Sequence, residues 1–153
     1  MIEFNSGLTN IYELTRSNLL ELIDNNEILS SRSHCRKFIQ HFELWPHEKQ
    51  NYYIAVEVMR WIPNSPDIGY FATQDKFVSM HSFKPSECIF SAFSVYEHIL
   101  IENRTSLIPC TNKGGRCWAL KFDDLVIETS KTAEMAICKS SIIINYILRT
   151  KCA

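Results

Sequence analysis

Apolar residues near the N-terminus of the chain recur at helical spacing. They follow one another loosely at three- and four-residue steps: Ile11, Leu14, Leu19, Leu22 and Ile23. Such spacing gathers apolar side chains on one side of a helix. The pattern therefore predicts a first helix, which the Asn25-Asn26 pair is expected to end.

A second helix is predicted by a clearer pattern. Its apolar positions follow the i, i+3, i+4, i+7 rule: Cys35, Phe38, Ile39 and Phe42. Ser31 or Ser33 can cap its start, because a serine hydroxyl accepts a hydrogen bond from a free backbone N–H. Pro46 bars continuation of the helix, because proline lacks that N–H.

The apolar period then changes to two. Residues 52–62 (YYIAVEVMRWI) are rich in β-branched and aromatic residues, which predicts a central strand. Turn-forming residues follow at 63–67. Residues 68–73 and 77–81 then predict a hairpin across Gln74, Asp75 and Lys76.

The second half of the chain repeats the order of helix and strands. Lys84-Pro85-Ser86-Glu87 is expected to open a helix with an apolar stripe from Ile89 to Leu100. The segments after it predict a strand (105–110), a turn (111–115), a hairpin (117–122 with 125–129) and a final helix from a Ser130 cap to Arg149. The predicted order is ααβββαβββα. Short connections between strands favour antiparallel pairing, so we expect one α+β domain over residues 1–153.

Length and charge narrow the class of protein. The chain has 153 residues and a net charge of −1, which suits one domain with one core. Nucleic-acid binders usually carry a clear basic excess, so no nucleic-acid partner is expected. The chain starts without a signal-peptide pattern, and its longest nearly apolar run, 142–148, is too short to span a membrane. We therefore expect a cytoplasmic protein without a membrane partner.

The six cysteines are expected to be reduced. No export signal accompanies them, and four lie in apolar or amphipathic segments, where a free cysteine packs as a small hydrophobe. They are Cys35, Cys88, Cys110, Cys117, Cys138 and Cys152.

No stretch meets the spacing of a known catalytic, cofactor or metal site, so none is predicted. The densest group of zinc-ligand types is His34, Cys35, His41 and His47, but its spacing fits no closed four-ligand site. The segment Lys113-Gly114-Gly115-Arg116 contains residue types that cradle phosphate, but it lacks the spacing of phosphate-binding loops and precedes a strand. A hairpin turn is the better interpretation of that segment.

One enzymatic alternative stays open. Cys88 lies near a predicted helix N-terminus, which lowers a thiol pKa. With His81 or His98 as a base, it could form a nucleophile pair. Such a pair is assembled in space, and sequence spacing does not predict it.

Charge and aromatic residues point instead to a protein partner. Residues 1–30 hold five acidic residues against Arg16 alone. Six rings also gather on the predicted strands: Tyr52, Tyr53, Trp61, Tyr70, Phe71 and Phe77. Carboxylates speed the encounter with a basic partner, and rings hold it. The predicted partner-binding residues are Glu21, Asp24, Glu27, Tyr53 and Trp61.

In these general features the whole chain resembles the small bacterial immunity proteins of toxin–immunity pairs. The shared features are a compact α+β domain, abundant rings and no catalytic motif, and no motif residue carries over. The resemblance implies a non-catalytic protein that binds and neutralises a cognate toxin domain. A chaperone of secretion is an alternative with a similar element order, although such proteins are usually more acidic than a pI of about 6.5. Oligomeric state stays open.

Overall fold

The structure, a computed structural model, describes residues 16, 18–64, 69–100 and 104–152. Five helical segments follow residues 18–21, which are also helical: α2 (Asn25–Leu44), α3 (His47–Tyr53), the π-helix η1 (Ile54–Val58), α4 (Ile89–Ile99) and α5 (Ala133–Cys152). The strands are β1 (Ile62–Pro63), β2 (Tyr70–Ala72), β3 (Phe77–Ser79), β4 (Thr105–Asn112), β5 (Gly115–Phe122) and β6 (Leu125–Ser130). The α+β class and the order ααβββαβββα are confirmed.

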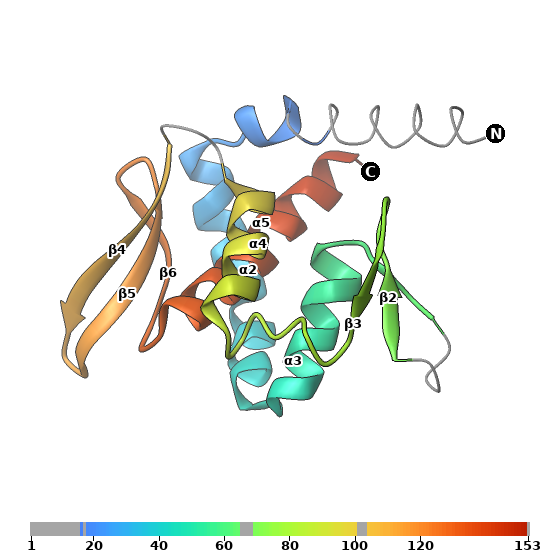
Figure 1. Cartoon of the computed structure of the whole chain (residues 1–153). Coiled ribbons are helices and arrows are strands. Elements are labelled where there is room, and N and C mark those ends of the chain that lie inside the picture. Colours follow the sequence, from blue (N-terminus) through green and yellow to red (C-terminus); the bar gives the residue numbers. More distant parts are fainter. Residues whose placement is uncertain (1–15, 17, 65–68, 101–103, 153) are drawn as a thin grey trace.

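Two antiparallel sheets lie on opposite sides of a helical layer. Strands β1, β2 and β3 form sheet A, and β4, β5 and β6 form sheet B. Helices α2, α4 and α5 stand between them, with sheet B on the left and sheet A on the right of Figure 1. The six described strands therefore form two separate three-stranded sheets.

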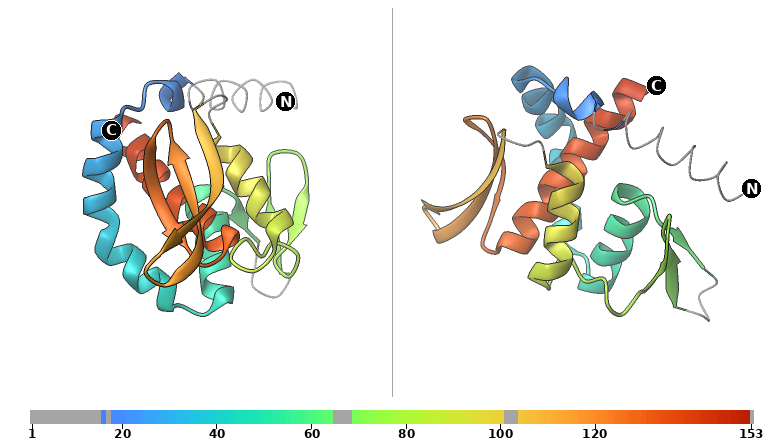
Figure 2. Two further views of the ribbon diagram at one scale, coloured as in Figure 1. Left: turned by 90° about the vertical axis from the view of Figure 1, so that its left-hand side faces the viewer. Right: turned by 45° about the horizontal axis from the view of Figure 1, so that its top comes forward.

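Helix α5 is the centre of this arrangement. It packs against α2, α4, β5, β6 and η1, and Figure 2 shows it behind sheet B. Ile142, Ile143, Ile144 and Ile147 are all buried. A run of β-branched residues has lower helix propensity, but a helix enclosed on several sides needs apolar residues all round. Burial therefore decides the conformation of this run.

The strand predicted for residues 52–62 is wrong. Residues 52–58 complete α3 and then form η1, in which Ile54, Ala55 and Val58 are buried. Only Ile62 reaches a strand. A short apolar run does not distinguish a buried strand from a buried helix by its period, and the bulky residues here lie against α5 rather than between two strands.

Backbone geometry explains how η1 ends. The Met59 N–H donates to the Ile54 carbonyl at 2.9 Å, which closes a five-residue step. Arg60 then adopts a left-handed conformation with φ of 61°, and this turns the chain out of the helix toward sheet A.

Some predicted helix starts are shifted. Asp24 caps α2, whereas Ser31 lies buried inside it. Cys88 is the N-cap of α4, so the proline segment 84–87 forms a turn before the helix. The Met135 N–H donates to Thr132 Oγ1 at 3.2 Å, which gives α5 a cap two residues beyond the predicted Ser130. Side-chain caps therefore set the starts of α2 and α5, whereas the Cys88 side chain makes no capping hydrogen bond at the start of α4.

The expectation of six reduced cysteines is corrected by the structure. Cys110 and Cys117 are joined by a disulfide with their Cα atoms 5.1 Å apart. The register of β4 and β5 places the two residues directly opposite each other. This pairing follows from the register of the hairpin. The positions of the six cysteines along the chain do not predict that register. Cys35, Cys88 and Cys138 are free.

A thiol count checks this disulfide. Protein that is denatured without reductant is expected to show two fewer reactive thiols than protein that is reduced first, since Cys110 and Cys117 are bonded. The Cys110→Ser/Cys117→Ser variant should remove that difference. Equal counts before and after reduction of the wild type would contradict the disulfide.

Candidate functional site

Sheet A presents an apolar face to solvent. In the antiparallel register Ile62 lies opposite Ala72, and Ala72 lies opposite Phe77. Tyr70 is two residues before Ala72, so it projects from the same face. The exposed fractions are 67% for Ile62, 43% for Tyr70 and 67% for Phe77. We define the outer face of sheet A by Ile62, Tyr70 and Phe77.

The inner face of the same sheet fixes this orientation. Phe71 and Val78 are paired in the register and pack on the core. The ring of Trp61 lies 6.1 Å from that of Phe71 and 4.5 Å from that of Phe83. A one-residue slip would exchange the two faces, and burial of Phe71 opposes such a slip. The register of sheet A therefore determines that Tyr70 and Phe77 are exposed.

The turn between β2 and β3 supports this geometry. The Thr73 hydroxyl donates to the Lys76 carbonyl at 2.9 Å and accepts from the Lys76 N–H at 3.1 Å. These contacts close the turn just before Phe77 and hold the Phe77 backbone in register opposite Ala72.

Tyr53 and Trp61, the two predicted ring contacts, do not lie on this face. Tyr53 belongs to an aromatic cluster, with its ring 5.1 Å from Phe38 and 5.8 Å from Trp45. Burial, followed by the charge of Glu57, raises its pKa. Trp61 supports the inner face, as above. Period-two spacing assigned both rings to a central strand with a ring-rich face, but Tyr53 ends a helix and Trp61 packs against Phe71 and Phe83.

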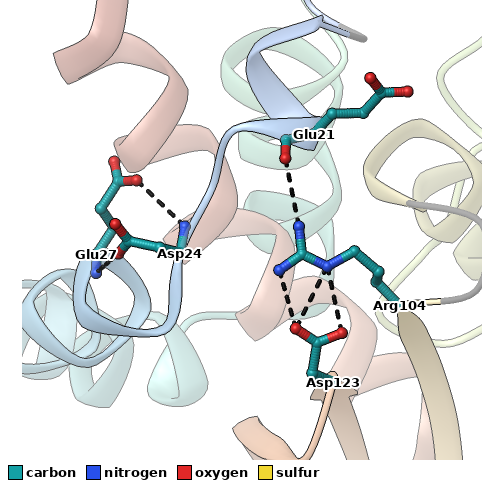
Figure 3. A network of polar contacts seen from close by, with 5 residues as sticks. All are labelled: Glu21, Asp24, Glu27, Arg104 and Asp123. Carbon is teal, nitrogen blue, oxygen red and sulfur yellow. Dashed lines mark hydrogen bonds and ion pairs between the residues drawn. The ribbon is translucent and has the colours of Figure 1, made fainter.

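The acidic residues Asp24 and Glu27 have a structural role. The Asp24 side chain accepts from the Glu27 N–H at 2.7 Å, and Glu27 Oε1 accepts from the Asp24 N–H at 3.2 Å. This reciprocal pair is a capping box at the start of α2 (Figure 3). Glu27 also forms an ion pair with Lys151 at 2.8 Å, so the box is tied to the end of α5.

Glu21 is arranged differently. Its backbone carbonyl accepts from Arg104 at 3.3 Å, while its carboxylate points away from that contact (Figure 3). Arg104 in turn pairs with Asp123 at 2.9 Å, and this partner raises the pKa of Arg104 and lowers that of Asp123. Glu21 is thus the member of the acidic trio whose carboxylate makes no hydrogen bond or ion pair with the residues that the structure describes.

The candidate Cys–His pair does not assemble through His98. Cys88 is the N-cap of α4 and His98 lies in its last turn, about 15 Å away at 1.5 Å per residue. His98 Nε2 lies 3.1 Å from the Val58 carbonyl, and burial lowers its pKa to about 4, with a further contribution from Arg16. The Cys88 thiol pKa is lowered by the backbone N–H groups of Ser91 and Phe90. His81 is exposed in the turn after β3, and no hydrogen bond between its ring and Cys88 occurs in the described part of the chain.

A serine–histidine contact does occur elsewhere, and sequence spacing gave no sign of it. His47 Nδ1 lies 2.9 Å from Ser86 Oγ, and Ser86 Oγ donates to Asn51 Oδ1 at 2.7 Å. Since the hydroxyl has one hydrogen, His47 is the donor to Ser86 and does not act as its base. Ser86 is only 4% exposed. The three residues fasten the turn before α4 onto α3.

The residues of zinc-ligand type are dispersed. His34 stacks on Tyr146 with ring centroids 4.5 Å apart, Cys35 is buried, and His47 contacts Ser86. No group of three or more His, Cys, Asp or Glu side chains suited to a metal ion occurs among the described residues. Likewise, no helix in the described ranges is long and apolar enough to cross a membrane.

Removal of the capping box should cost stability. Asp24→Ala is expected to lower the free energy of unfolding by about 1 kcal/mol, because it leaves a helix-terminal N–H unsatisfied. Glu21→Ala removes the same charge three residues earlier and should change stability by less than about 0.5 kcal/mol. Urea denaturation of both variants provides the comparison, and equal losses would contradict the separate roles of the two carboxylates.

Stability should depend on His98 in mildly acidic solution. The pKa of His98 is about 4 when folded against 6.5 for an unperturbed histidine, so the unfolded chain binds more protons between these values. Stability that is present above pH 6.5 is therefore lost as the pH falls toward 4. The loss should exceed that of His98→Gln, which keeps a donor for Val58, by about 2–3 kcal/mol. Parallel pH profiles of the two proteins would exclude this linkage.

Comparison with curated proteins and with solved structures finds no match to this chain. One family model matches residues 52–142, which is more than half of the chain. The matched segment runs from the end of α3 into α5 and includes both sheets. The chain therefore belongs to the family described as the Phage ABA sandwich domain.

Proposed function

We propose that this protein is a non-catalytic binding module that acts by occupying a partner protein. The observation that carries the proposal is the outer face of sheet A, with Ile62, Tyr70 and Phe77 exposed together. Large apolar side chains gathered on one exposed face are characteristic of protein–protein contacts, and ring anchors supply much of the binding free energy there.

The most specific form of the proposal is an immunity protein that neutralises a cognate toxin domain. Toxin domains that act on nucleic acids tend to be basic because they approach phosphates. An inhibitor of such a domain gains encounter rate from exposed carboxylates. Asp24 and Glu27 are engaged in the capping box, so Glu21 is the member of the trio that we assign to this electrostatic role.

The family description supports a phage context for this domain. We therefore propose that the protein acts in the cytoplasm of an infected bacterium. Disulfides rarely persist in that reducing compartment. Trapping the redox state of Cys110 and Cys117 in intact cells therefore tests the location directly.

Substitution of the outer face should abolish partner binding. We expect the tagged full chain to retain a specific protein from a lysate of its native host, identified by mass spectrometry. Ile62→Ser/Phe77→Ser should weaken binding of that purified protein at least about a hundredfold, because two central anchors are lost. The matched control is Leu44→Ser/Phe90→Ser, which removes two apolar residues that are 85% and 81% exposed elsewhere.

The electrostatic part has its own readout. Glu21→Lys should slow association with a basic partner and reduce the salt dependence of the rate. If Ile62→Ser/Phe77→Ser binds the partner as tightly as the wild type, the outer face of sheet A is not the binding surface. If Glu21→Lys leaves the association rate unchanged, Glu21 has no electrostatic role in binding. If no partner is retained and the purified chain turns over a substrate in a broad hydrolase screen, the binding module itself is wrong.

A further inference from the structure

An open pocket of about 730 Å³ lies at one end of sheet B. The tip of the β4–β5 hairpin, the end of β6 and the first turns of α5 surround it. Figure 1 shows sheet B across the helical layer from sheet A, so this pocket is separate from the outer face proposed above. The volume is within the range of small-molecule sites, about 300–1,000 Å³.

The pocket is rich in positive charge. Four cations line it (Lys113, Arg116, Lys131 and Lys139), and the one acidic residue among the described lining residues is Glu43. Glu128 also contacts Lys139. Four cations against Glu43 and Glu128 give the pocket region a net charge of +2, whereas the whole chain has a net charge of −1. A concave site with charge of one sign concentrates ions of the opposite sign.

Lys139 forms the anchored part of the pocket. Its side chain is 8% exposed and forms ion pairs with Glu43 and with Glu128, the latter at 3.4 Å. It also donates to the Thr129 carbonyl at 2.7 Å. These contacts hold α5, α2 and β6 together at the pocket. The two ion pairs neutralise the charge of Lys139, so this lysine is not free to bind an anion.

Three cations remain for a ligand. Lys113, Arg116 and Lys131 are exposed, and none of them forms an ion pair with a residue in the described ranges. They come from the hairpin turn, from β5 and from the residue pair before α5, so they approach the pocket from different sides.

The backbone that presents two of these cations is held rigidly. Strands β4 and β5 are paired as far as Asn112 and Gly115 on either side of the turn, and the Gly114 N–H donates to Asn112 Oδ1 at 2.8 Å. Gly115 has φ of 103°, a conformation that a glycine adopts without strain. Because the hairpin is already ordered, binding does not have to order it, which favours affinity.

We propose that this pocket binds the phosphate groups of a small phosphorylated molecule. A multiply charged oxyanion can satisfy three separate cations, and Arg116 can pair with it in a bidentate manner. Thr129 and Ser130 line the same space, and a hydroxyl group is a further donor for the oxygens of an oxyanion. The segment 113–116 thus forms the expected hairpin turn and also contributes to an anion site.

The lining also indicates how such a ligand is recognised. None of the described lining residues is aromatic, so a nucleobase would find no ring on which to stack. Recognition therefore rests on the phosphates. A polynucleotide is disfavoured because the charge is confined to one pocket of an acidic-to-neutral chain, whereas nucleic-acid binders carry an extended basic surface.

Calorimetric titration of the full chain with pyrophosphate at low salt tests the proposal. We expect saturable binding at one site. Arg116→Glu and Lys131→Glu should each weaken it at least about tenfold, as is typical when a charge-assisted hydrogen bond is lost. The milder Arg116→Gln and Lys131→Gln variants serve if a reversal disturbs folding. The control is Lys37→Glu, an exposed α2 position outside the pocket, which should change affinity by less than about twofold.

Two further titrations distinguish the sources of the phosphate. Equal affinity for inorganic phosphate and pyrophosphate assigns the site to free phosphate, whereas tighter binding of pyrophosphate or ATP assigns it to a phosphorylated metabolite; either outcome supports the proposal. Absence of saturable binding up to about 10 mM, equal weakening by Lys37→Glu, or a strong preference for a single-stranded oligonucleotide over pyrophosphate would overturn it.

Discussion

Helix α5 lies between two other helices and sheet B, and its burial on nearly every side constrains the rest of the molecule. Each fully buried isoleucine contributes about 1.5–3 kcal/mol relative to an exposed one, so the run 142–144 stabilises the packed state strongly. Any element that contacts α5 must offer it an apolar surface. Residues 54–58 satisfy that requirement as a π-helix rather than as a strand.

The same burial makes Lys139 significant. A charge at the edge of an apolar helix layer has to be paired, because removal from water is costly. Glu43 and Glu128 supply the partners from α2 and β6. The ion-pair group that satisfies this lysine also forms the floor of the basic pocket, so the requirements of folding and the chemistry of the pocket meet at one side chain.

The helical layer separates two surfaces of different chemistry. Sheet A exposes rings and an isoleucine, which suits a protein partner, and sheet B ends in free cations, which suit an anion. Neither surface includes residues of the other, so each proposal can be tested without affecting the other. Both also differ from the Cys–His hypothesis, for which α4 holds Cys88 and His98 at opposite ends.

The sequence by itself determined the α+β class, the element order, the hairpins at 70–79 and 117–129 and the stop of α2 before Pro46, because these depend on local period, turn residues and proline. Tertiary structure decided the rest. Asp24 and Glu27 became a capping box, Tyr53 entered an aromatic cluster, and Cys110 met Cys117, because each outcome depends on which residues lie opposite one another in space. Within sheet A, Tyr70 and Phe77 are exposed and Phe71 is buried for the same reason. Period two predicts that faces alternate, but only packing against the core decides which face is turned to solvent.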